Sequence, residues 1–250
     1  MAYMTRSMKT CKFTRILLKL SGASLMGNRT GGIDSPSLNA IASDIESAHQ
    51  QGVQLAVVIG GGNIFRGTQS SGFPIHRVTA DYMGMMATII NALALRDSLK
   101  TGGSPAKVMS ALEVGNVVEP FNRERAIGYL EEGAIVVFAG GTGNPYVTTD
   151  TAATLRAIEI EAQAILKATQ VDGVYDRDPA KEQKSQLFTR ISYEQVLSQK
   201  LGVMDLTAIS LAMEHHIPII VFNIGKRGDI ARICSGLKVG TLIAGEGDER

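Results

Sequence analysis

Short, continuous apolar runs constrain the fold of this chain more than any other feature. They recur at 15–20, 55–59, 106–111, 134–139, 162–168, 217–222 and 241–244. Most are apolar at successive positions rather than alternating, as in strands of a parallel sheet that helices cover on both faces. Segments with helical patterning separate them, at 34–51, 78–99, 122–132, 151–161, 205–215 and 228–235. The pattern predicts an α/β fold, a three-layer αβα sandwich with a mainly parallel open sheet.

The chain divides into an arm and one domain. Residues 1–13 are polar and predict a loose N-terminal arm, and no linker or internal repeat interrupts residues 14–250. The 25 basic and 24 acidic side chains leave a net charge of +1, so the surface offers no broad attraction for nucleic acid or a membrane. No signal peptide or membrane-length apolar run is evident, which predicts a cytoplasmic protein. Any phosphate site must therefore be local.

The expected helix at 78–99 is apolar nearly all round, with the sequence MGMMATIINALAL at its centre. Such a helix is buried on more than one side, either in the core or at a contact between subunits.

The segment AVVIGGGNIFRG, residues 56–67, runs an apolar strand into three consecutive glycines. Ordered glycine is unfavourable unless the chain turns sharply or something approaches its backbone closely. The glycine N–H groups could form an anion-binding nest, with the positive end of a helix beginning in the next turn. Arg66 would reach the same anion. A plain strand-to-helix turn with an exposed arginine is the alternative.

Polar clusters follow other predicted strands, where the ligand crevice of an open α/β sheet lies. Lys19 in KLSGAS falls out of phase with Leu18 and Leu20, and could be either a surface residue or a phosphate ligand. Asp150 follows AGGTGNPYVTT, and could either stabilise a helix N-terminus or orient Lys19. Tyr175, in KATQVDGVYDRDP, could pack an adenine ring or belong to an ordinary loop.

Several common sites are excluded by their missing motifs. The chain has no GxxxxGK[ST], no GxGxxG and no GxSxG. Its four histidines lack metal-binding spacing, and Cys11 and Cys234 lie far apart without a CxxC, so free thiols and no protein-held metal are expected.

Taken together, KLSGAS, VVIGGGNIFRG, RVTADYMGMMATIINALALRD, GTGNPYVTTDTAATLRAIEIEA, KATQVDGVYDRDP and VMDLTA closely resemble the bacterial uridylate (UMP) kinases of the amino acid kinase superfamily. The resemblance covers about residues 14–244. It implies transfer of the γ-phosphoryl group of ATP to UMP, with Mg²⁺ bound mainly through the nucleotide phosphates, in a cytoplasmic homohexamer. It also implies an acceptor-binding part at about 14–150 and an ATP-binding part at about 151–250.

The resemblance assigns roles to individual residues. Those implied for catalysis are Lys19, Arg66 and Asp150. Those implied for ATP are Lys19, Leu20, Ser21, Gly22, Gly62, Arg66, Thr169, Tyr175 and Asp178. Those implied for UMP are Gly61, Asp81, Thr142, Gly143, Asn144, Pro145, Tyr146, Val147, Thr148 and Thr149.

Regulation is a further implication of the resemblance. Family members often respond to GTP as activator and UTP as inhibitor, and one region implicated in effector binding corresponds to Gly27, Asn28, Arg29, Thr30, Gly31 and Gly32. The chain departs from the family at Ala23, where KLSGE is common, which puts any role of that carboxylate in doubt.

Two other functions stay open at this point. Another superfamily member would phosphorylate a carboxylate or carbamate, which the TADYMGMMAT and GTGNPYVTTD segments disfavour. A catalytically silent nucleotide-binding or storage protein on the same fold is disfavoured by Lys19, Arg66 and Asp150.

Overall fold

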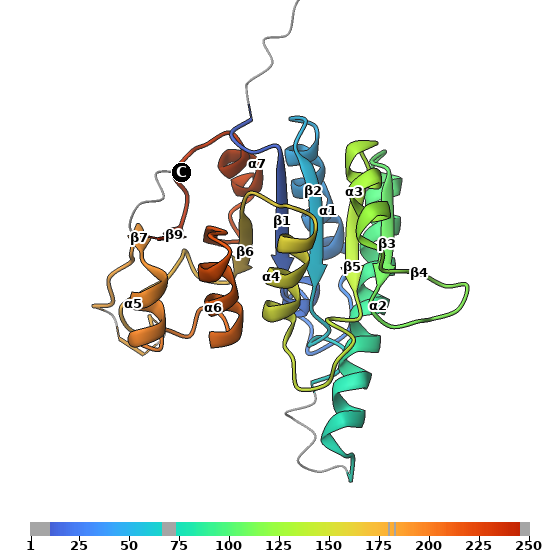
Figure 1. Cartoon of the computed structure of the whole chain (residues 1–250), viewed down its shortest axis with the longest axis horizontal. Coiled ribbons are helices and arrows are strands. Elements are labelled where there is room, and N and C mark those ends of the chain that lie inside the picture. The colour runs from blue at the N-terminus through green and yellow to red at the C-terminus, as the bar shows by residue number, and fades with distance from the viewer. Residues whose placement is uncertain (1–10, 67–73, 180, 183, 246–250) are drawn as a thin grey trace, which may run out of the picture.

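The computed structural model describes residues 11–66, 74–179, 181–182 and 184–245. Over these residues the chain forms one nine-stranded sheet with the strand order β4-β3-β5-β2-β1-β6-β8-β9-β7 (Figure 1). The strands are β1 (Arg15–Leu20), β2 (Gln54–Ile59), β3 (Ala106–Ser110), β4 (Glu119–Pro120), β5 (Ile135–Ala139), β6 (Ile165–Thr169), β7 (Arg190–Ile191), β8 (Ile219–Asn223) and β9 (Thr241–Ile243). All neighbouring pairs are parallel except β8 and β9.

Helices cover both faces of the sheet. They are α1 (Ser35–His49), α2 (Arg77–Thr101), α3 (Arg123–Glu131), α4 (Thr149–Glu159), α5 (Tyr193–Ser198), α6 (Leu206–Glu214), α7 (Asp229–Cys234) and the 3-10 turn η1 (Gly22–Leu25). One apolar core joins α1, α2 and α7 to the sheet, and a second joins α3, α4, α5 and α6 to the opposite face. Strand β1 contributes side chains to both apolar cores, since Leu18 packs in the first and Leu17 in the second. The predicted three-layer sandwich is confirmed.

Local sequence explains where the principal helices begin. The Asp34 carboxylate accepts the Ser37 N–H at 3.0 Å, and Pro36 stands in the first turn, as expected for the start of α1. Thr148 caps α4 through its hydroxyl, so α4 begins two residues before the predicted 151. The short helix α5 was not predicted, because its six residues are too few to show a clear apolar period.

Helix α2 has the length and hydropathy of a candidate membrane span, with a mean hydropathy of 1.3 over its most apolar window. In this protein 44% of that window is buried, and the helix packs against α1, β3 and β5. One side of the helix therefore lies in the core, as the first of the two predicted alternatives has it, and the second, a contact between subunits, stays a prediction. Its outer side exposes Tyr82, Met83, Met86 and Ile90.

The predicted loose arm ends earlier than residue 13. The Lys12 N–H donates to the Cys234 carbonyl at 2.8 Å, the Cys11 thiol reaches the same oxygen, and Phe13 is buried. These residues therefore belong to the packed body, because Phe13 joins the core beside α7. The rest of the arm, residues 1–10, lies outside the described residues. Cys11 and Cys234 are free thiols.

The prediction that a helix starts after the triple glycine is wrong. Residues 62–64 form a turn, in which the Ile64 and Phe65 N–H groups donate to the Gly61 carbonyl. Residues 65 and 66, which follow it, are not helical. The Arg66 guanidinium folds back to the Gly62 carbonyl at 2.8 Å. Without a helix terminus, any anion bound there depends on backbone N–H groups and arginine.

Candidate active site

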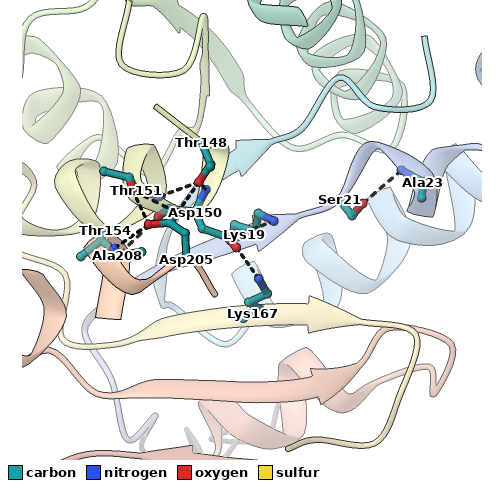
Figure 2. Close-up of polar contacts among 10 residues, drawn as sticks. All are labelled: Lys19, Ser21, Ala23, Thr148, Asp150, Thr151, Thr154, Lys167, Asp205 and Ala208. Atoms are coloured by element: carbon teal, nitrogen blue, oxygen red, sulfur yellow. Dashed lines mark hydrogen bonds and ion pairs between the residues drawn. The ribbon is translucent and has the colours of Figure 1, made fainter. Parts of the chain in front are cut away.

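Two lysines and one carboxylate meet at the carboxyl edge of the sheet (Figure 2). Lys19 near the end of β1 is the direct register partner of Lys167 on the parallel neighbour β6, so both side chains leave the same face of the sheet. Asp150, in the first turn of α4 above that face, lies 2.6 Å from the Lys19 Nζ and 2.7 Å from the Lys167 Nζ. The register thus explains why Lys19 is out of phase with its apolar neighbours.

These three groups leave a surplus of one positive charge in a largely buried position. The lysine side chains are 11% and 10% exposed and that of Asp150 is 15% exposed. Burial raises the pKa of Asp150, but the charges and hydrogen bonds of the two lysines outweigh it, so the pKa lies below its ordinary value. Burial and the charge of Lys19 lower the pKa of Lys167 despite Asp150. A site with this balance favours an anion, because an added negative charge compensates the second lysine.

The orientation of Asp150 depends on a hydrogen-bond network at the start of α4 (Figure 2). Thr148 accepts the Asp150 N–H at 3.1 Å, and its hydroxyl donates to Asp205. Thr151 also donates to Asp205, at 2.9 Å, and Asp205 itself caps α6 through the Ala208 N–H. Asp205 therefore ties the first turns of α4 and α6 together and fixes the turn that carries Asp150.

A cavity of about 740 Å³ opens on one side of this trio. Its walls include Lys19, Ser21, Lys167, Thr169, Tyr175 and Asp178. The structure thus brings most residues expected to bind ATP into one space, which we call the donor cavity. It is large enough for a nucleotide. Because Lys19 and Ser21 belong to the predicted acceptor-binding part, the donor cavity draws on both parts of the chain.

A second cavity, of about 310 Å³, lies on the other side, and we call it the acceptor cavity. Its walls include Gly61, Gly62, Arg66, Asp81, Tyr146, Val147, Thr148 and Thr149. Gly62 and Arg66, which the resemblance assigns to ATP, line this cavity and not the donor cavity. Thr149 lines the acceptor cavity and directly precedes Asp150, so the lysine–carboxylate trio lies between the two spaces.

Other expected site residues lie nearby without lining either cavity. The Leu20 side chain is fully buried in the core, and its carbonyl accepts the Gly60 N–H at 2.9 Å. Thr142, Gly143, Asn144 and Pro145 form the first half of the loop whose second half lines the acceptor cavity. In the predicted effector segment, Gly27 and Asn28 line a separate cavity of about 310 Å³, which shares Ala23 and Ser24 with the donor cavity.

The triple glycine is explained by close approach of backbone to backbone. A Cβ on Gly22 would meet the Gly60 carbonyl at 2.8 Å and the Gly62 nitrogen at 2.9 Å, and one on Gly61 would meet the Gly84 carbonyl of α2 at 2.6 Å. None of the three consecutive glycines has a positive φ. The glycine turns after β1 and β2 are therefore packed against each other and against α2.

Three residues of the site were not predicted from the sequence: Lys167, Asp205 and Arg77. Lys167 could have been found, since it ends an apolar run just as Lys19 does and has the same phase relative to it. Asp205 lies in the VMDLTA segment, which carried no role. Arg77, which lines the acceptor cavity, gave no signal beyond its charge.

The part of the chain that the structure describes contains no group of three or more His, Cys, Asp or Glu side chains that could hold a metal ion. The lysine–carboxylate trio offers a single carboxylate, with both oxygens engaged. This arrangement suits Mg²⁺ that arrives on nucleotide phosphates, because Mg²⁺ retains waters and needs few protein ligands.

Fold and site together identify the class of protein. The chain belongs to the amino acid kinase family, whose sequence profile matches residues 14–223.

The chain is also similar to solved structures within this family. A UMP kinase from Bacillus anthracis is 41% identical, with a TM-score of 0.91 over 94% of this chain and 97% of that one. A UMP kinase from Ureaplasma parvum is 38% identical, with a TM-score of 0.87 over 92% and 98%. A uridylate kinase from Archaeoglobus fulgidus is 29% identical, with a TM-score of 0.71 over 92% and 99%. The predicted resemblance to UMP kinases is confirmed.

Proposed function

We propose that this protein is a UMP kinase, which transfers the γ-phosphoryl group of ATP to UMP and yields ADP and UDP. The observation that carries the proposal is the buried trio of Lys19, Asp150 and Lys167, with its surplus positive charge, between two cavities. The likeness to UMP kinases over nearly the whole chain supports UMP as the acceptor.

In this proposal the two lysines stabilise the transferred phosphoryl group. Phosphoryl transfer depends on alignment and on neutralising charge more than on covalent catalysis. Lys19 and Lys167 both line the donor cavity, so their ammonium groups would face the phosphates of ATP. Asp150 orients both ammonium groups. It takes no proton from UMP, whose phosphate is already largely dianionic at pH 7 because its second pKa is about 6.

Mg²⁺ would supply charge neutralisation on the ATP phosphates. Its direct ligands would be phosphate oxygens and water.

The acceptor cavity would bind UMP. Arg66 would pair with its phosphate, and Asp81, Tyr146 and Thr148 would bind the nucleoside. The small approach distance between the glycine turns would keep the two nucleotides close enough for direct transfer.

A coupled assay for ADP release tests the proposal. Turnover that requires UMP supports it, whereas turnover with an amino-acid carboxylate, or ATP binding without turnover, contradicts it. Lys19→Ala should lower kcat by at least about 100-fold, as expected when a preorganised charge is removed from the transition state. Circular dichroism of the variant should match the wild type, because Lys19 lies at the cavity and outside both apolar cores.

Assembly, regulation and location are further parts of the proposal. The exposed apolar row Tyr82, Met86 and Ile90 on α2 supports a homo-oligomer, which we propose to be a hexamer. Light scattering gives its mass, and a monomeric wild type would contradict it. We further propose a cytoplasmic enzyme that GTP activates and UTP inhibits, and unchanged UMP kinetics on titration with either nucleotide would contradict the regulation.

A further inference from the structure

Arg77, the first residue of α2, has a position that helix stability does not explain. A cation at a helix N-terminus faces the positive end of the helix dipole. Its carboxylate partner, Asp81, lies four residues later, and this base-before-acid order is the less stabilising one on a helix. The side chain is 53% exposed, so burial does not explain the arginine either.

The contacts of Arg77 point into the acceptor cavity instead. Its Nε lies 2.9 Å from each carboxylate oxygen of Asp81. The same carboxylate accepts the Tyr146 N–H at 2.9 Å, and the guanidinium lies 5.4 Å from the centroid of the Tyr146 ring. The three residues form a closed cluster that joins α2 to the loop after β5, across 65 positions of sequence.

Tyr146 needs such a support. Its φ of 68° lies in the left-handed region, which is uncommon for a residue with a bulky side chain. Conformations of this kind persist only where their surroundings hold them. The residue is 66% exposed, so core packing does not hold it, and among the described residues its backbone N–H is held by Asp81 and its ring lies beside Arg77.

All three residues line the acceptor cavity together with Arg66. We propose that Arg77 is a positioning residue of the acceptor site: it orients the Asp81 carboxylate and holds Tyr146 in the cavity wall. This inference rests on the proposed function, in which Asp81 and Tyr146 bind UMP. Arg77 acts through these two residues and makes no contact with the reacting phosphates.

Steady-state kinetics of Arg77→Met test the inference. The KM for UMP should rise about tenfold, as expected for the loss of a charge-assisted hydrogen-bonded pair. The KM for ATP and kcat should stay within about twofold of the wild type, since uniform acceptor binding changes KM alone. Arg77→Lys should recover part of the loss. Arg123→Met is the matched control, because Arg123 is also the first residue of its helix and pairs with a carboxylate, Glu161, outside both cavities.

A double-mutant cycle distinguishes positioning from direct contact. If Arg77 acts through Asp81, then Arg77→Met should have little further effect on the KM for UMP in an Asp81→Asn background. Additive effects would overturn the inference, as would equal rises in both KM values.

Hydrogen exchange provides a readout that needs no substrate. In Arg77→Met the amide of Tyr146 should exchange faster than in the wild type and in Arg123→Met, and unchanged exchange would overturn the inference. Failure of the wild type to turn over UMP would refute the proposed function, while the exchange measurement would still decide the restraint of Tyr146.

Discussion

Replacing Asp150 by asparagine removes the carboxylate that pairs with both Lys19 and Lys167 while keeping the shape of the side chain. Lys19 and Lys167 are direct register partners on neighbouring strands. Their ammonium groups would then repel each other in a largely buried position. Removing one member of a buried ionic cluster costs about 3–5 kcal/mol of unfolding free energy. For a domain of this size that corresponds to a fall in Tm of about 6–20 °C.

Urea unfolding and thermal scans of Asp150→Asn measure this loss. Asp97→Asn is the control, since Asp97 also pairs with a cationic side chain, Arg96, but is 67% exposed. Its replacement should change the unfolding free energy by less than about 0.5 kcal/mol. Adding Lys167→Met to Asp150→Asn should restore part of the stability, with a coupling energy of at least about 1 kcal/mol, because it removes the repulsion.

The pH dependence gives the sign of the effect. The folded-state pKa of Asp150 lies below its ordinary value, so its contribution to stability is present above the unfolded pKa of about 3.9 and is lost as pH falls through the folded value. The difference between wild type and Asp150→Asn should therefore shrink below about pH 4. A stability change no larger than that of Asp97→Asn at pH 7, or a wild-type kcat, would refute the reasoning about this trio.

Three further outcomes are expected. Gly61→Ala should lower Tm and raise the KM for UMP, because its Cβ would lie 2.6 Å from the Gly84 carbonyl and push α2 away from the acceptor cavity; an unchanged Tm would contradict this packing. Iodoacetamide should modify Cys11 before Cys234, since burial raises the pKa of Cys234 to about 12, and mass spectrometry of the native protein checks the order. In the pH profile of kcat, the midpoint of the alkaline decrease should lie below the ordinary lysine pKa of about 10.4, because burial lowers the pKa of Lys167 and its charge is lost as pH rises. Lys167→Arg should move this midpoint to higher pH.

Local sequence features were sufficient for most of the fold. Each of the seven predicted strands is present, because a continuous apolar run between turn signals has few alternatives to a buried strand. The start of the first helix, predicted at residue 34, agrees with α1 to within one residue, because the Asp34 cap involves residues only three positions apart. The helix predicted after the triple glycine is wrong, because a glycine-rich sequence does not show which segment of the chain packs against its backbone.

The sequence by itself determined seven of the nine strands, the mainly parallel character of the sheet and the presence of Lys19 and Asp150 near one edge, because parallel strands necessarily end on the same side. Tertiary structure alone decided that Lys167 stands beside Lys19, that Arg66 lines the acceptor cavity, and that Arg77 reaches Tyr146. The physical reason is that such contacts depend on strand register and on the path of loops. Both are set by packing between segments far apart in the chain, whereas apolar period and helix capping are set by neighbours.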